Sequence, residues 1–220
     1  MYPAAITIWL DYLMRLAGQE FEDHIGIDRH ARLKLAGIRT GQALLRWTHA
    51  RMRYAMGDVP HEMPDQYELR RLAEPYYHSR LNGGEGDMLV GKALWAYHEK
   101  KAHMICELSP YSCMPNTMSV GAMSAVVGKY PDLLYAPLEI KGDAEVHALS
   151  RCQMILTEAK KRAQREFDEV LEHTGITIEQ VRAYLAEHPE MRKATYRVPH
   201  GGVAGAAANL VLHVAERRRQ

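Results

Sequence analysis

Apolar positions predict a helical N-terminal region. Ile8, Trp9, Tyr12, Leu13 and Leu16 recur at helical spacing, so residues 2–17 are expected to form a short extended piece and then a helix. A long helix is predicted over residues 28–56, with Asp28 as its N-cap. Its seam is formed by Leu33, Gly37, Gly41, Leu44, Leu45, Thr48 and Met52, and the small residues in it would let a neighbouring helix approach closely.

The middle of the chain alternates strand and helix. A helix over residues 65–78, interrupted by Pro75, precedes a Gly-rich turn at residues 82–87 that feeds another helix. Next come a strand (102–108), a loop (109–116), a helix (117–129), a second strand (133–140) and a long helix (143–173). This order predicts the α/β class, with a parallel sheet covered by helices. Shorter helices are expected at residues 178–187 and 203–216.

We therefore expect two parts: a helical N-terminal arm (residues 1–63) and an α/β lobe with C-terminal helices (residues 64–220). The chain has 220 residues, of which 47% are hydrophobic and 25% charged, so a folded core is expected rather than disorder. The net charge of +1 argues against nucleic acid as a partner, and the apolar runs are too short to span a membrane. Three cysteines without a secretory signal favour the reducing cytoplasm.

Four arginines fall seven residues apart on the long N-terminal helix: Arg32, Arg39, Arg46 and Arg53. That spacing places them along one stripe of the helix. The stripe is either an anion-binding surface, for coenzyme phosphates or an acidic partner, or an ordinary solvated face.

The Gly-rich turn before the next helix contains Gly84, Glu85 and Gly86. Such a turn exposes backbone N–H groups at a helix N-terminus and can hold an anion. It is not a nucleotide-binding fingerprint, because no Lys-Ser/Thr pair follows. Its simpler interpretation is a turn that starts a helix.

Cys113 is the cysteine that the sequence favours for chemistry. It lies in the loop after the first strand, at the edge where parallel sheets bind ligands, between Pro110 and Pro115. Asn116 or Thr117 is expected to cap the next helix, whose N-terminus would stabilise the Cys113 thiolate. Cys106 and Cys152 are expected to be core residues on an apolar strand and an apolar helix face.

Residues 84–86 and the segment 105–116, which reads ICELSPYSCMPN, resemble the iron–sulfur superfamily of 2-hydroxyacyl-CoA dehydratases and benzoyl-CoA reductases. They are most similar to the related domain of activase-associated proteins in that system. The family pattern is Gly-Glu-Gly at a helix start, a strand, and a loop of the form Pro-Phe-x-Cys-hydrophobic-Pro. Residues 110–115 match that loop with Tyr111 in place of Phe, and residues 142–151 and 206–211 resemble later segments.

The resemblance implies a flavodoxin-like lobe and a [4Fe-4S] or related cluster that receives low-potential electrons from an ATP-dependent activator protein. It implies an acyl-CoA thioester as substrate, Cys113 as a cluster ligand, and Gly84, Glu85, Gly86, Pro115 and Asn116 as residues around the cluster. Only Cys113 matches a family ligand, and the family's other ligands lie in an N-terminal half without a counterpart here. A homologous or complementary subunit would therefore supply the remaining cysteines.

Three functions remain open from the sequence. The first is a component of an acyl-CoA dehydratase or reductase system that helps to hold the cluster. The second is a non-catalytic docking or assembly subunit that has lost the cluster. The third is an independent thiol enzyme that uses Cys113 and a nearby histidine.

Overall fold

The computed structural model describes residues 6–58, 61–81, 84–142 and 145–219. The predicted extended piece before the first helix, Asn82 and Gly83 of the Gly-rich turn, and residues 143–144 lie outside the described residues. The elements in chain order are α1 (Ile6–Asp23), α2 (Ala31–Ala55), α3 (Gln66–Ala73), α4 (Gly86–His98), β1 (Ile105–Pro110), α5 (Met114–Lys129), β2 (Tyr135–Ile140), α6 (Glu145–Thr174), α7 (Ile178–Glu187), the 3₁₀ turn η1 (Pro189–Arg192) and α8 (Ala206–Arg217).

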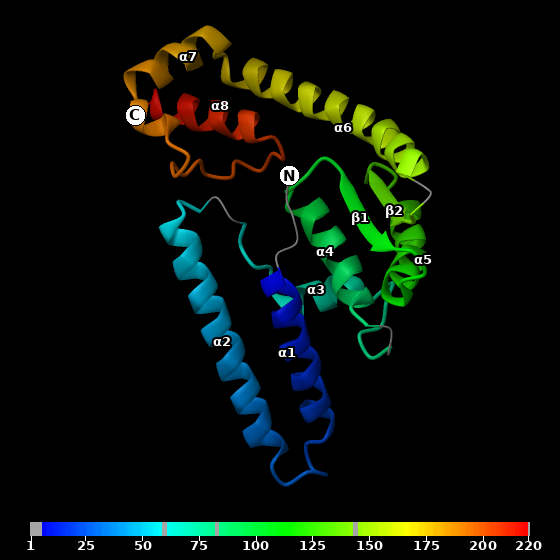
Figure 1. Ribbon diagram of the computed structural model, residues 1–220. Helices are drawn as coiled ribbons and strands as arrows, with labels where there is room; N and C mark the ends of the chain where they lie inside the picture. Colours follow the sequence, from blue (N-terminus) through cyan, green and yellow to red (C-terminus); the bar gives the residue numbers. More distant parts are fainter. Residues whose placement is uncertain (1–5, 59–60, 82–83, 143–144, 220) are drawn as a thin grey trace.

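Strands β1 and β2 form a parallel sheet, with the register running from Ile105 beside Tyr135 to Pro110 beside Ile140. Helix α5 connects the two strands (Figure 1). One side of the sheet packs on α4 and α5 through a core that includes Leu94, Met123 and Val126, while α6 contacts β2. The predicted parallel sheet with covering helices is confirmed, and it has two strands among the described residues.

Several boundaries differ from the prediction. Helix α5 begins at Met114 rather than residue 117, because Pro115 is tolerated in a first helical turn and Cys113 takes the N-cap position. The expectation that Asn116 or Thr117 caps this helix is therefore wrong. The prediction that Asp28 is the N-cap of α2 is also wrong, because His30 takes that position. The Asp28 carboxylate instead accepts a hydrogen bond from the His30 backbone N–H at 2.8 Å.

Helices α1 and α2 form an antiparallel hairpin that extends away from the sheet (Figure 1). Gly18 of α1 lies against Leu35 and Ile38 of α2. The hairpin joins the rest of the fold through α1, whose Ile8 and Tyr12 belong to a core cluster shared with α3 and α4. Helix α1 therefore lies between α2 and the lobe.

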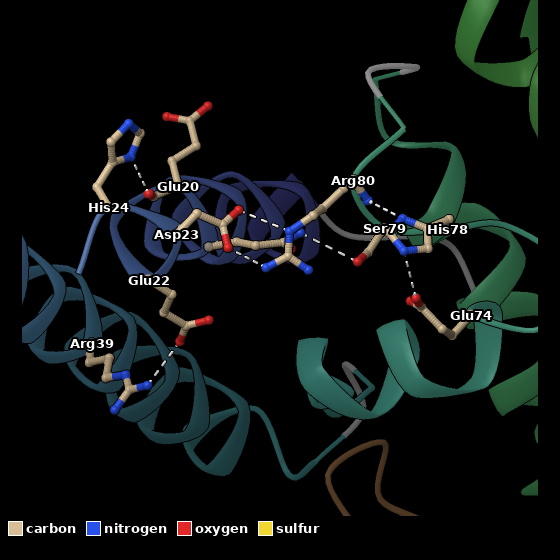
Figure 2. A network of polar contacts seen from close by, with 10 residues as sticks. Glu20, Glu22, Asp23, His24, Arg39, Glu74, His78, Ser79 and Arg80 are labelled. Carbon is tan, nitrogen blue, oxygen red and sulfur yellow. Dashed lines mark hydrogen bonds and ion pairs between the residues drawn. The ribbon is translucent and has the colours of Figure 1, made fainter. Parts of the chain in front are cut away.

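Exposed polar contacts add to this attachment at the C-terminal end of α1. Figure 2 shows the Arg80 guanidinium against the Asp23 carboxylate, with the Arg80 Nε–H donating to Asp23 Oδ2 at 2.9 Å. Arg80 lies after α3, so the pair ties the far end of α1 to the lobe. Such exposed pairs add little to stability but help to fix an orientation.

The C-terminal helices build a second core beyond the sheet. The last turns of α6 meet α7, η1 and α8 around Val170, Met191 and Val214. Helix α7 has the bounds that the sequence predicts and starts with a capping box formed by Thr177 and Gln180. In the part of the chain that the structure describes, no helix has the length and apolar character needed to cross a membrane.

Candidate functional site

Cys113 lies at the carboxyl end of β1, directly before the first turn of α5. Its thiol is half-buried and makes no capping hydrogen bond, while its carbonyl oxygen accepts the Thr117 backbone N–H at 2.9 Å. An N-cap position places a side chain beside the unpaired N–H groups of a helix N-terminus. The location is the sheet edge that the sequence predicts for ligand chemistry.

The residue before Cys113 has an unusual backbone. Ser112 has a φ of 61°, in the left-handed region that costs a non-glycine residue roughly 1–2 kcal/mol. Its backbone N–H donates to Glu139 Oε1 at 3.0 Å, which ties the turn to the last part of β2. A strained turn held by a neighbouring strand sets the direction in which Cys113 leaves the sheet.

The Gly-rich turn packs directly on the start of α5. Gly84 has a φ of +63°, and a Cβ added there would lie 2.5 Å from Cγ of Pro115. Gly86 lies under the ring of Tyr77, which a Cβ would approach to 2.7 Å. The structure therefore brings Gly84 against Pro115, two predicted site residues from distant segments, with Cys113 and Asn116 on either side of that proline in sequence.

The positive end of α4 is occupied by this chain's own carboxylate. Asp87, in the first turn of α4, forms a 2.5 Å ion pair with Nη2 of Arg15 from α1, and both side chains are almost fully buried. Burial raises the pKa of Asp87, and the Arg15 charge opposes that shift. Tyr12 donates its hydroxyl to the Gly84 carbonyl oxygen at 2.6 Å, and burial, followed by the Asp87 charge, raises the pKa of Tyr12. The turn thus anchors α1, and Glu85 is the N-cap of α4 without a side-chain capping bond.

A half-buried carboxylate joins both strands to α5. Glu107 of β1 accepts hydrogen bonds from Asn116 Nδ2 at 2.8 Å, from the Ser119 hydroxyl, and from the Tyr135 hydroxyl at 2.6 Å. Burial, and next the hydrogen bond to Glu107, raise the pKa of Tyr135. Asn116 therefore holds the first turn of α5 against β1. Glu107 is not among the site residues predicted from the sequence, although a carboxylate within an apolar strand is a signal for such a role.

Contrary to the prediction, Cys106 and Cys152 do not lie in the core. The Cys106 side chain is exposed, because alternate residues of β1 face the poorly covered side of the sheet. Burial of part of the thiol, and then the nearby Cys152, raise the pKa of Cys106. Cys152 is half-buried on α6. Cys106 and Glu107 are adjacent on β1, so their side chains point to opposite faces of the sheet. Cys106 therefore lies on the face opposite to the hydrogen bond between Glu107 and Asn116.

The arginine stripe is used within the chain. Arg39 pairs with Glu22 at 3.0 Å, Arg46 with Asp11 at 2.9 Å, and Arg53 lies 3.7 Å from Asp58. Arg39 and Arg46 border α1 and meet its carboxylates, and Arg53 meets Asp58 beyond the end of α2, so these arginines form ion pairs within the chain on a partly solvated face. Arg32 is exposed.

A cavity of about 130 Å³ lies at the opposite, amino-terminal ends of the strands. Glu166 of α6 borders it and accepts the Gly205 backbone N–H at 2.7 Å, while its Oε1 lies 3.0 Å from Nε2 of His103. These contacts fix the start of α8 against the sheet. The lining residues come from segments far apart in the sequence, so no local pattern marks this cavity.

No protein-family model, curated protein or solved structure matches this chain. The likeness to the acyl-CoA dehydratase and reductase superfamily therefore remains a prediction from residues 84–86 and 105–116.

Proposed function

We propose that this protein is a component of an acyl-CoA dehydratase or reductase type of iron–sulfur redox system. In this role the Cys113 thiolate is one ligand of a [4Fe-4S]-type cluster shared with a partner chain. The position of Cys113 is the observation that carries the proposal. Cys113 is half-buried and is the N-cap residue of the 16-residue helix α5. It directly follows the strained turn at Ser112, at the carboxyl end of β1.

The donor set of this chain fits one ligand of such a cluster. Among the described residues, no three His, Cys, Asp or Glu side chains gather closely enough to hold a metal ion. Cys106 faces the other side of the sheet. A cubane needs four protein ligands, so a partner chain has to supply the others. The cluster, when bound, transfers single electrons, and the role of this chain is to hold the thiolate and shield it from water.

The same proposal extends to the fold. The two strands would be part of a flavodoxin-like sheet that continues in the partner, because β1 pairs only with β2 among the described residues. Pro115 and Gly84 would then form one wall around the cluster. An ATP-dependent activator protein would deliver the electrons, and an acyl-CoA thioester would be the substrate.

Anaerobic co-expression with the chains encoded by the neighbouring genes tests this proposal. We expect a brown complex that contains iron and acid-labile sulfide and shows the electron paramagnetic resonance signal of a reduced cluster. Cys113→Ser should remove most of the iron, while the matched control Cys152→Ser, another half-buried cysteine, should keep it. An iron-free wild-type complex, or a Cys113→Ser complex that retains its iron, would contradict the proposal.

A second candidate function is a docking or assembly subunit without a cluster. It is favoured by the part of the sheet face that α6 does not cover, where Leu108 of β1 is 63% exposed and Ile140 of β2 is 52% exposed. Among the described residues, the outer edge of β1 pairs with no further strand. In that case a stable complex with the partner should survive Cys113→Ser and dissociate in Leu108→Glu. Val198→Glu, at an exposed apolar residue elsewhere, is the control.

A further inference from the structure

The cavity at the amino-terminal ends of β1 and β2 is remote from Cys113, which lies at the carboxyl end of β1. Its walls combine hydrocarbon from Met104, Leu133 and Leu134 with charged side chains. At about 30 Å³ per water molecule, its volume of about 130 Å³ holds about four groups of that size. The cavity is therefore large enough for a ligand of about four to six non-hydrogen atoms and too small for a coenzyme.

The two carboxylates in the lining of the cavity accept hydrogen bonds from this chain. Oε2 of Glu166 accepts the Ala204 backbone N–H at 3.0 Å, and Oε1 lies 3.0 Å from Nε2 of His103. The Tyr97 hydroxyl donates to the Asp132 carboxylate, at 2.7 Å to Oδ1 and 2.8 Å to Oδ2. Each negative charge of the lining therefore already has donors, and a ligand does not have to supply them.

Lys100 and Arg162, the cations in the lining, keep donors that no described residue uses. The Lys100 ammonium lies 5.2 Å from the ring centre of Tyr97 and forms no ion pair within the described chain. Arg162 donates its Nε–H to Glu158 at 3.2 Å and an Nη1–H to the Asp132 carbonyl oxygen, which leaves Nη2 without a hydrogen bond to the described residues. The pKa of Asp132 is lowered first by its Tyr97 hydrogen bond and then also by the charges of both cations. The two cations therefore act on the same end of the cavity.

The backbone of Lys100 is held in an unusual conformation beside the cavity. Its φ of 50° lies in the left-handed region, which disfavours a residue with a Cβ. Nε2 of His200, in the segment before α8, lies 3.2 Å from the Lys100 carbonyl oxygen. The next residue, Lys101, is held by Glu62 at 2.9 Å. The surrounding structure thus fixes the point from which the Lys100 side chain extends.

We propose that this cavity binds a short-chain aliphatic carboxylate. The ligand's carboxylate accepts hydrogen bonds from the Lys100 ammonium and from Nη2 of Arg162, because such charged donors match a carboxylate. Its alkyl chain lies on the apolar wall of the cavity, which an inorganic anion would leave uncovered. An alkylammonium ion of the same size would instead face two like charges. The site is independent of Cys113 and of the proposed cluster.

Amide chemical shifts of the full chain, labelled with nitrogen-15, test this site. Titration with sodium butyrate at neutral pH and constant ionic strength should move the amide signals of Ala102 and Ala204, which border the cavity, and saturate with a Kd of about 1 mM. 1-Butanol and butylammonium chloride have the same alkyl chain without the negative charge, and neither should give saturable shifts. Sodium phosphate, an anion without an alkyl chain, should bind about tenfold more weakly than butyrate.

Substitutions in the lining form the second part of the test. Arg162→Met keeps a long side chain and should raise the butyrate Kd about tenfold, because a charge-assisted hydrogen bond is lost. Ala204→Leu changes no charge and should raise the Kd at least as much, since the larger side chain fills part of the cavity. The matched controls Arg165→Met and Ala207→Leu lie at exposed positions of α6 and α8 and should bind butyrate as the wild type does.

Several results would overturn the proposal. They are an absence of saturable shifts with butyrate, equal binding of butylammonium, tighter binding of phosphate, and a loss of affinity in the controls as large as in the cavity variants. Dispersed amide signals show whether each variant folds. If Arg162→Met does not fold, Lys100→Met at the exposed edge of the cavity replaces it, and an unchanged butyrate Kd in that variant would contradict the role of the cations.

Discussion

The two helical regions on either side of the sheet distribute their polar and apolar residues in opposite ways. The C-terminal helices α6, α7 and α8 bury hydrocarbon, with Val214 and Val211 almost fully inaccessible. The N-terminal hairpin buries an ion pair, Arg15 with Asp87, where it meets the lobe and leaves Leu33 and Leu44 exposed on its far side. The core where the end of α6 meets α7 and α8 therefore encloses its apolar side chains, and the hairpin does not enclose all of its own.

This contrast bears on both stability and assembly. A buried ion pair depends on both partners, because removal of one leaves an uncompensated charge. An apolar cluster loses stability in proportion to the atoms removed. The attachment of the hairpin should thus be sensitive to single charge changes, whereas the C-terminal core should respond gradually.

The largest expected effect is at Asp87. Asp87→Ala should lower the free energy of unfolding by about 3–5 kcal/mol, because it leaves the Arg15 guanidinium buried without its counter-charge. Urea denaturation at a fixed protein concentration measures the loss. Asp23→Ala, which removes the exposed carboxylate that pairs with Arg80, is the control and should change stability little.

A double variant separates charge from packing. Arg15→Met combined with Asp87→Leu should recover part of the stability lost in Asp87→Ala, because both charges leave the interior together. If the double variant is less stable than Asp87→Ala, the pair is not the reason for the loss and the contrast between the two regions fails.

The C-terminal core should show a smaller effect for a comparable truncation. Val214→Ala should lower the free energy of unfolding by about 2 kcal/mol, from two lost methyl groups and the cavity they leave. The same denaturation experiment measures it, with Val146→Ala at an exposed position as control. A loss as large as that of Asp87→Ala would remove the distinction.

Within the hairpin, the partly buried ion pair should matter more than the exposed one. Arg46→Ala should cost about 1 kcal/mol, because Asp11 is fully buried but keeps the Gln42 amide as a donor at 3.0 Å. Arg39→Ala removes an exposed partner of Glu22 and should cost less. Equal losses for the two variants would mean that burial of Asp11 has no energetic consequence.

Local patterns predicted most of the helices and the two strands. Helical spacing located α2 within three residues at its start, and the signals at Thr177 and Gln180 mark the start of α7. The predicted burial of the first strand was wrong for one of its two faces. The apolar run around Cys106 suggests burial on both faces, but α6 covers β2 more than β1 and leaves alternate residues of β1 exposed.

The site was predictable only in its local part. The loop with Cys113 and its proximity to a helix N-terminus follow from neighbouring residues. The contact of Gly84 with Pro115 and the pairing of Arg46 with Asp11 join residues 31 and 35 positions apart in sequence. No local pattern encodes such contacts, which is why the arginine stripe was located correctly and its partners were missed.

The smallest expected effect is a change in the pH dependence of the C-terminal core. Burial, and next the Arg217 charge, lower the pKa of His213. Its Nε2 lies 2.8 Å from the Tyr196 hydroxyl, and its buried Nδ1 has no hydrogen-bond partner among the described residues. The unfolded chain therefore binds a proton to this residue at a higher pH than the folded chain does.

Stability from His213 should accordingly be complete above the unfolded pKa of about 6.5 and be lost as the pH falls through that value toward the lower, folded pKa. His213→Gln, which does not titrate, should flatten the plot of unfolding free energy against pH between about 7 and 5 relative to the wild type. Parallel plots of unfolding free energy against pH for the wild type and His213→Gln would contradict this prediction. They would show that the surroundings of His213 on α8 accept the charged imidazole, so that the C-terminal core tolerates a charge as the hairpin interface does.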